Sequence, residues 1–307
     1  KIAQWLGRAK ERIPALDAEL MILMVFREVW PRGVDRSYIV AHDDTEITPG
    51  RLEILTNMLV RRIKKEPLAY ILGEKEFYGR MFWVTPEVLI PRPETESLIE
   101  LVKELKLPKQ PRFMEVGTGS GCVAITLALE FPQSKVLATD ISERALDIAE
   151  QNDIIHEGRV EFLKADLIGG LVENIQEEAK YRNLQMYSPE LKTQDYDYVD
   201  DGSEEPDWFE DLQFDVVVAN LPYVDPGWEW LDTEALDYEP KTALYVRDEN
   251  GLGLYRRFFR ELKELKTHYV TIEADPCQHT ALVKMAEEFG WGCQKIEGFA
   301  LLFVRRF

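Results

Sequence analysis

From residue 112 onward, short apolar segments alternate with longer amphipathic segments. The short segments have the length of strands, and the longer ones have the length and spacing of helices. This alternation predicts a parallel, doubly wound α/β sheet, because parallel neighbours need a crossover connection that is usually a helix. Seven strands are expected, at residues 113–117, 135–140, 160–166, 214–220, 269–273, 292–296 and 300–304.

The first 66 residues have a helical pattern instead. Apolar residues recur there at intervals of three and four, which is the spacing of one helix face. Thr48 and Pro49 are typical of a helix start, because Thr caps free backbone N–H groups and Pro fits the first turn. One apolar stripe consists of Leu16, Leu20, Leu23 and Met24. We expect residues 1–66 to form a small helical domain that docks a partner, with a packing role as the alternative.

Residues 67–96 connect the two parts. Bulky and aromatic residues around Gly73 and Gly79 predict a β-hairpin. The two prolines on either side of Arg92 then force an extended, stiff path. That path could be only a rigid linker, but stiff loops that carry charges beside a binding strand often have a function. We therefore predict that Arg92 and Glu94 contact the substrate, and that residues 97–307 form the sheet domain.

A glycine-rich turn follows the first strand of the sheet. Dinucleotide-binding proteins use the spacing G-x-G-x-x-G, in which the third glycine allows close helix packing beside a pyrophosphate. The third glycine of that spacing would fall at position 122, where this chain has Cys. The turn therefore favours a ligand without a pyrophosphate, whose amino-acid portion lies against exposed backbone. The predicted contacts are Gly117, Thr118, Gly119, Ser120 and Gly121.

Two acids follow the next two strands. Asp140 ends the second strand about twenty residues after the turn, where a carboxylate can accept hydrogen bonds from ribose hydroxyls. Asp166 ends the predicted third strand and could bind an adenine amino group, with Leu167 packing on the ring. One glycine turn and two acids at successive strand ends favour S-adenosylmethionine over NAD as the cofactor.

The apolar strand 214–220 ends in Asn220-Leu221-Pro222-Tyr223. The Asn220 side-chain oxygen and the Leu221 carbonyl can accept the two hydrogens of a planar nitrogen, either a base amine or a carboxamide. This would hold the nitrogen in line with a sulfonium methyl and favour attack by its lone pair. Tyr223 would present its ring to the planar acceptor. We predict that these four residues, Pro222 included, form the catalytic and substrate-binding motif.

The net charge of −19 argues against broad nucleic-acid binding, which needs a basic surface. About half of this charge lies in one segment, since residues 171–213 hold thirteen acids and three bases. A segment of this length and composition inside a compact domain is usually disordered or functional. We expect residues 170–212 to be a surface insertion that is partly disordered, with an acidic arm for a basic partner as the alternative.

The remaining composition indicates a cytoplasmic protein without a metal. Cys122, Cys277 and Cys293 have no metal-ligand spacing and are expected to be reduced packing residues. The residues at the start of the sequence show no signal-peptide pattern, and no apolar run reaches the roughly 18 residues of a membrane span. We expect neither membrane nor direct nucleic-acid binding, and a monomer.

Several of these motifs together resemble one family, the HemK/PrmC release-factor glutamine methyltransferases. The likeness covers nearly the whole chain except the acidic segment. It differs at position 221, which is Leu where the family typically has Pro, and at position 167, which is Leu where the family often has an aromatic residue. The matching stretches are Glu66–Gly73, Phe77–Gly79, Val88–Glu96, Glu115–Gly121, Asn220–Tyr223, Tyr238–Leu244 and Asp248–Tyr255.

The resemblance implies a seven-stranded, Rossmann-like class I methyltransferase domain that uses S-adenosylmethionine. It implies methylation of the side-chain N5 of the glutamine in the Gly-Gly-Gln (GGQ) loop of peptide-chain release factors, a step that serves translation termination. It also implies cofactor contacts at Gly117–Gly121, Asp140, Asp166, Leu167 and Asn220. Two hypotheses stand beside it. One is an adenine-N6 or ribosomal-protein methyltransferase, since Asn-Leu-Pro-Tyr also resembles adenine-N6 dimethyltransferases of ribosomal RNA. The other is a non-catalytic protein built on a degenerate methyltransferase fold.

Overall fold

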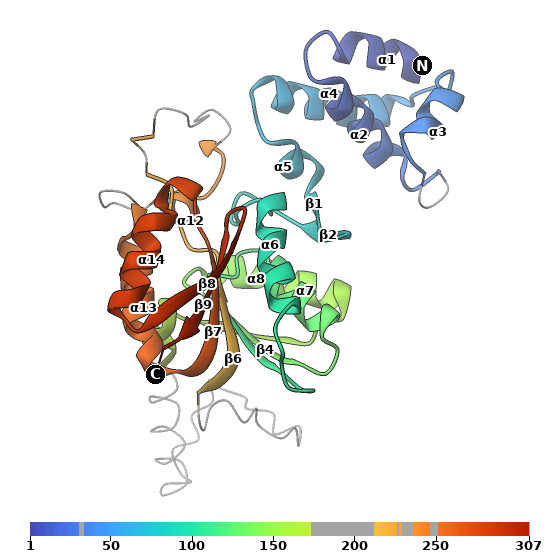
Figure 1. The fold of residues 1–307 in the computed structure, drawn as a ribbon. Coiled ribbons are helices and arrows are strands. Elements are labelled where there is room, and N and C mark those ends of the chain that lie inside the picture. Colours follow the sequence, from blue (N-terminus) through green and yellow to red (C-terminus); the bar gives the residue numbers. More distant parts are fainter. Residues whose placement is uncertain (31–33, 173–211, 226, 229–235, 246–250, 307) are drawn as a thin grey trace, which may run out of the picture.

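A seven-stranded sheet forms the centre of the part of the protein that follows residue 96 (Figure 1). Its strand order is β5-β4-β3-β6-β7-β9-β8, and the first five strands in that order are parallel. β9 is antiparallel to both of its neighbours. The predicted fold class is confirmed. The strands are β3 (Arg112–Val116), β4 (Lys135–Asp140), β5 (Val160–Lys164), β6 (Gln213–Ala219), β7 (Lys266–Glu273), β8 (Trp291–Glu297) and β9 (Ala300–Arg305).

The computed structural model describes residues 1–30, 34–172, 212–225, 227–228, 236–245 and 251–306. The acidic segment predicted at 170–212 lies almost entirely outside the described residues. No helix in the described ranges is long and apolar enough to cross a bilayer. Two predicted strand boundaries differ by more than one residue. β7 begins at Lys266 instead of Tyr269, and β5 ends at Lys164 instead of continuing to Asp166, with a helical segment that begins at residue 167.

Helices cover both faces of the sheet (Figure 1). The central strand β6 explains why, since Val216 and Val218 pack on one face while Val217 and Ala219 pack on the other. A strand buried on both faces has a continuous apolar run instead of an alternating one. One face is covered by α6 (Glu96–Lys103), α7 (Cys122–Glu130) and α8 (Glu143–His156), and the other by α13 (Gly253–Glu261) and α14 (His279–Glu288).

In the described residues, five α-helices precede the sheet domain, and α1 to α4 form the group set apart from the sheet in Figure 1. The predicted start of the fourth helix is confirmed, because Thr48 accepts a hydrogen bond from the backbone of Arg51. The predicted apolar stripe of the second helix is wrong at one end only: Leu16 is 46% exposed, whereas Leu23 and Met24 pack partly buried against the helical core. This helix is apolar on most sides, so the surrounding helices decide which face is buried. The helices are α1 (Ile2–Ala9), α2 (Ala15–Phe26), α3 (Arg36–Ala41), α4 (Pro49–Ile63) and α5 (Leu68–Leu72), and the buried face of α2 contains Ala18, Met21, Ile22 and Phe26.

The predicted hairpin is confirmed and is tied to the sheet domain. Strands β1 (Glu74–Phe77) and β2 (Arg80–Trp83) pair antiparallel. Asn152 of α8 is fully buried beside them. Its Oδ1 accepts from the Trp83 N–H at 2.7 Å, and its Nδ2 donates to the carbonyls of Trp83 and Ser120 at 2.9 Å each. One side chain thus joins the hairpin, a helix and the glycine turn. Short elements complete the described fold: η1 (Pro93–Thr95), α12 (Lys241–Leu244), η4 (Leu262–Glu264) and η5 (Pro276–Gln278).

Asn152→Ala is expected to lower the free energy of unfolding by about 3 kcal/mol, because it leaves buried backbone groups without partners. Urea unfolding followed by circular dichroism measures this loss. Gln151→Ala, at the exposed neighbouring position of α8, is the matched control and should change stability by no more than about 0.5 kcal/mol. A loss for Asn152→Ala as small as that of the control would contradict the linking role of Asn152.

Candidate functional site

Three predicted functional residues, Gly117, Asp140 and Asn220, lie in one row across the sheet together with Glu273, for which no role was predicted. Gly117 follows β3, Asn220 follows β6, and Asp140 and Glu273 are the last residues of β4 and β7. β3 and β6 are neighbours although the strands between them in sequence lie elsewhere, so the row crosses the switch point where doubly wound sheets bind ligands. The residues just before this row are paired from strand to strand: Thr139, Val116, Ala219 and Ile272.

A pocket of about 360 Å³ lies over this row. Its size is in the range of sites that hold a small molecule or cofactor. Three predicted residues, Gly121, Glu94 and Tyr223, are not among its lining residues. The other predicted residues do line it: Arg92, Gly117, Thr118, Gly119, Ser120, Asp140, Asp166, Leu167, Asn220, Leu221 and Pro222.

The glycine turn combines an open backbone with one packing position. The N–H groups of Gly117 and Thr118 both donate to the Thr139 carbonyl, at 2.8 and 2.9 Å. Gly119 has a φ of +56°, and a Cβ added there would meet nothing within 4 Å, which fits a surface left free for a ligand. Gly121 differs, because a Cβ there would lie 2.9 Å from the Ile125 side chain. Gly121 therefore serves the packing of α7, and its predicted ligand contact stays a prediction.

Asp140 stabilises the turn and also faces the pocket. Its two carboxylate oxygens accept from the backbone N–H groups of Gly119 and Ser142, at 2.9 Å each. Burial raises the pKa of Asp140, and these two N–H groups oppose the rise. Each carboxylate oxygen still has a lone pair, so Asp140 can accept further hydrogen bonds from ribose hydroxyls. This arrangement fits the predicted cofactor.

Asp166 and Leu167 form the outer corner of the pocket. The Asp166 carboxylate, 49% exposed, is paired through both oxygens with Arg257 of α13 at 2.9 Å. Its predicted contact with an adenine amino group would have to share the carboxylate with this arginine. Leu167 is buried with a φ of +54°, a costly backbone conformation for a bulky residue that is found mainly at functional sites.

Glu115 is a fully buried acid under the glycine turn. It accepts hydrogen bonds from the Thr118 hydroxyl at 2.5 Å and from the Ala124 N–H at 3.0 Å. Burial raises the pKa of Glu115 to about 8, and the negative charge of Asp140 adds to the rise, while the two hydrogen bonds oppose it. Glu115 therefore binds a proton more tightly in the folded protein than in the unfolded chain.

This difference predicts how stability depends on pH. Between the ordinary pKa near 4.5 and the folded value of about 8, only the folded protein keeps the proton on Glu115, so stability falls as pH rises. The contribution of Glu115 to this fall is about 1.4 kcal/mol per pH unit. Glu115→Gln should remove it in urea unfolding series between pH 5 and 8. Glu150→Gln, exposed on α8, is the control, and an unchanged slope in Glu115→Gln would contradict the prediction.

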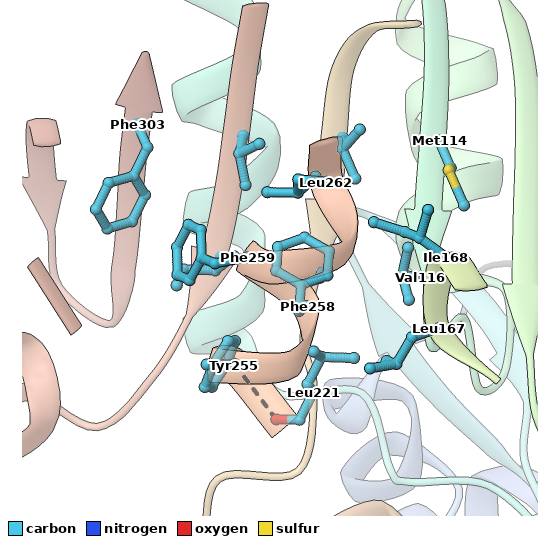
Figure 2. Packing of buried hydrophobic residues seen from close by; sticks show 14 of the residues in the cluster. Met114, Val116, Leu167, Ile168, Leu221, Tyr255, Phe258, Phe259, Leu262 and Phe303 are labelled. Atoms are coloured by element: carbon cyan, nitrogen blue, oxygen red, sulfur yellow. Dashed lines mark hydrogen bonds between the residues drawn. The ribbon is translucent and has the colours of Figure 1, made fainter. Parts of the chain in front are cut away.

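The Asn-Leu-Pro-Tyr motif is held from several sides. Asn220 Nδ2 donates to the Thr95 hydroxyl oxygen at 3.2 Å. The carboxamide oxygen of Asn220 is then left to accept a hydrogen bond from the substrate nitrogen that would receive the methyl group. The Tyr255 hydroxyl donates its one hydrogen mainly to the Glu273 carbonyl and lies 3.4 Å from the Leu221 carbonyl oxygen, so this oxygen can still accept a hydrogen bond. Figure 2 shows the Leu221 side chain buried between Tyr255 and Leu167. A Cβ on Gly117 would lie 3.3 Å from this side chain, so Leu221 joins the motif to the glycine turn.

Tyr223 is turned toward the protein interior. Its hydroxyl donates to Glu273 Oε1 at 3.0 Å, and its carbonyl accepts from Gln278 Nε2 at 2.9 Å. Gly251 packs against the same peptide, because a Cβ there would lie 2.3 Å from the Tyr223 carbonyl oxygen. Burial raises the pKa of the Tyr223 hydroxyl above its ordinary value. The predicted contact of this ring with the substrate stays a prediction.

Arg92 forms an ion pair that closes one wall of the pocket. Its Nη2 donates to Glu239 Oε1 at 2.6 Å, and the Ile90 N–H donates to the other oxygen of Glu239 at 3.4 Å. Glu239 is buried. Arg92 therefore joins the proline-rich segment to the segment before α12. Glu94 is exposed at the surface. Substrate binding by Arg92 and Glu94 stays a prediction.

Sequence reasoning assigned no site role to several of these residues, Glu115 and Arg257 included. Thr95, Glu239 and Tyr255 lie inside motifs that carried the family resemblance, so those motifs were an available signal. Glu273 and Gln278 lie in no such motif. The available signal for Glu273 was that it is an acid at the end of a predicted strand. The contacts that involve these residues join segments far apart in sequence, and only the tertiary structure reveals them.

A sheet of this order, with a glycine turn after β3 and an acid at the end of β4, defines a class I methyltransferase domain, whose methyl donor is S-adenosylmethionine. Residues 1–73 match the PrmC N-terminal domain, and residues 95–181 match the methyltransferase small domain. The chain belongs to the release factor glutamine methyltransferase family.

Several relatives carry that family name, among them the following three. The protein from Koribacter versatilis is 36% identical over 254 residues, which are 82% of this chain and 75% of that protein. The protein from Bacteroides thetaiotaomicron is 34% identical, over 76% of this chain and 71% of that protein. The protein from Neisseria gonorrhoeae is 33% identical, over 78% of this chain and 72% of that protein.

Proposed function

We propose that this protein transfers a methyl group from S-adenosylmethionine to the side-chain N5 of the glutamine in the GGQ motif of peptide-chain release factors. The observation that carries the proposal is the position of Asn220-Leu221-Pro222-Tyr223. The motif begins one residue beyond β6, beside the glycine turn, in a chain of the release factor glutamine methyltransferase family.

The residues of this chain would act by binding and orientation. When bound, S-adenosylmethionine supplies a methyl group on a sulfonium, an electrophile that an amide nitrogen can attack. The Asn220 carboxamide oxygen and the Leu221 carbonyl accept the two hydrogens of the glutamine nitrogen. These contacts hold the nitrogen in line with the methyl group and favour localisation of its lone pair. The nitrogen would give up one of its protons to water after transfer, so no strong general base of this chain would be needed.

The remaining parts of the chain have roles consistent with this reaction. Residues 1–66 dock the release factor, residues 67–96 set the position of this helical domain, and residues 97–307 carry out the transfer. The net charge of −19 favours a protein substrate over direct nucleic-acid binding. The enzyme acts as a monomer in the cytoplasm, where release factors act on ribosomes.

Incubation with S-adenosylmethionine and a release factor, followed by mass spectrometry of the GGQ peptide, tests this proposal. One added methyl group on the glutamine is expected, and none when a release factor with Glu in place of that Gln is supplied. A peptide that stays unmodified, while calorimetry shows that the cofactor binds, would contradict the proposed substrate.

A further inference from the structure

Glu273 is a buried acid directly behind the Asn-Leu-Pro-Tyr motif. It ends β7, and the register pair Ala219–Ile272 places it level with Asn220. Its exposed fraction is 1%, and it is not among the residues that line the pocket. Glu273 can therefore act on the reaction only through residues that it contacts, such as Tyr223.

The two side-chain oxygens of Glu273 differ in their hydrogen bonding. Oε1 accepts from the Tyr223 hydroxyl at 3.0 Å, whereas Oε2 has no hydrogen-bond partner among the described residues. Burial raises the pKa of Glu273, the nearby Glu94 adds to the rise, and polar groups of Thr95, Tyr223 and Asn220 oppose it. A buried carboxylate oxygen without a partner costs free energy, and such atoms often mark a functional constraint.

A purely structural role explains this arrangement less well. The nearby Tyr255 hydroxyl donates to the backbone carbonyl of Glu273, so that contact does not need the Glu273 side chain. The side chain itself contacts the Tyr223 hydroxyl and lies beside Thr95 and Asn220. Asn220 in turn donates to Thr95. Among the described residues, three polar neighbours of this carboxylate, Thr95, Asn220 and Tyr223, therefore lie in or beside the motif proposed to hold the substrate nitrogen.

We propose that Glu273 is a positioning residue for methyl transfer, which holds Tyr223 and, with Thr95, fixes the orientation of the Asn220 carboxamide. This assignment rests on the proposed function. It adds to the residues needed for the reaction one that does not line the pocket. A fixed hydroxyl at Tyr223 keeps the Asn220–Tyr223 backbone in one conformation. The Asn220 oxygen and the Leu221 carbonyl then reach the two hydrogens of one nitrogen.

The test compares variants in the release-factor assay, with cofactor affinity measured by calorimetry. Glu273→Ala should lower kcat about a hundredfold, the size of effect that a misplaced reacting group produces. It should leave the Kd for the cofactor within about threefold, because Glu273 does not line the pocket. Glu273→Gln should recover kcat to within about fivefold of wild type, because its amide oxygen can accept from Tyr223. Thr271→Val, two residues earlier on the same face of β7, is the matched control and should keep wild-type kcat.

A double-mutant cycle with Tyr223→Phe tests whether Glu273 acts through Tyr223. The double variant should be no slower than Glu273→Ala alone, because the contact is already lost. If the effects of the two single substitutions on kcat multiply in the double variant, the two side chains act independently and the proposal is overturned. A Glu273→Ala variant with kcat within threefold of wild type, or one that loses cofactor affinity and kcat together, would also overturn it.

If wild-type protein leaves the GGQ peptide unmodified, the proposed function fails, but the positioning network is still tested by thermal unfolding. The Tm shifts of Glu273→Ala and Tyr223→Phe should then be less than additive in the double variant. Additive shifts would show that the two side chains are not coupled and would overturn the inference.

Discussion

Asn220→Ala is expected to lower the rate of methyl transfer about a thousandfold, the upper range for removal of one preorganised polar contact to the reacting group. The variant loses the carboxamide oxygen that would accept a hydrogen of the substrate nitrogen. It also loses the Nδ2 group that donates to Thr95. The alanine side chain has no polar atom that could replace either contact. Cofactor affinity should fall only modestly, because Gly117–Ser120 and Asp140 stay in place. Single-turnover kinetics and calorimetry measure the two effects separately.

The control for this prediction is Asn220→Asp, which keeps an acceptor oxygen but loses the donor to Thr95. Its rate should lie between those of wild type and Asn220→Ala. If cofactor binding is lost together with activity in Asn220→Ala, then Asn220 is chiefly a cofactor ligand and its assigned role in holding the substrate nitrogen is wrong.

Asp140→Ala is expected to weaken cofactor binding about a hundredfold, while the rate at saturating cofactor falls much less. The variant loses the charged acceptor for ribose hydroxyls, and the N–H groups of Gly119 and Ser142 lose their partner. Two ribose hydrogen bonds to the charged carboxylate, each contributing about 1.5 kcal/mol, correspond to a roughly hundredfold change in Kd. Calorimetric titration with S-adenosylmethionine measures the affinity.

Two further variants test whether the loss of affinity is due to the Asp140 carboxylate. Asp140→Asn keeps one acceptor oxygen and should bind the cofactor with intermediate affinity. Asp147→Ala changes an exposed acid on the following helix, α8, and should bind like wild type. Equal affinities for Asp140→Ala and wild type would show that the ribose is held elsewhere, and the predicted role of Asp140 would be wrong.

The positions of strands and strand ends were predictable because they depend on local pattern. The run Val216–Ala219 is apolar on both faces, and only a central strand of a doubly wound sheet requires that. The end of such a strand is then the place where a ligand binds. Asp140 and Asn220 were identified by this argument, and the structure places both beside one pocket. Asp166 was misplaced at a strand end because element boundaries depend on hydrogen bonds that sequence pattern does not specify.

Contacts between distant segments were not predictable. Arg92 and Asp166 have the residue types of a binding site, but each is engaged in an ion pair, with Glu239 and Arg257 respectively. The buried face of α2 was misjudged for a similar reason, since several of its faces are apolar and its neighbours decide which one is covered.

The sequence by itself determined the fold class, the position of the glycine turn, the Asn-Leu-Pro-Tyr motif and the family, because periodicity, glycine spacing and strand-end residues are local properties of the chain. Only the tertiary structure decided what each side chain contacts. It revealed that Gly121 serves packing, that the Tyr223 hydroxyl is turned toward Glu273, and that Asn220 donates a hydrogen bond to Thr95. The physical reason is that the direction of a side chain depends on partners many residues away, which come together only when the sheet forms.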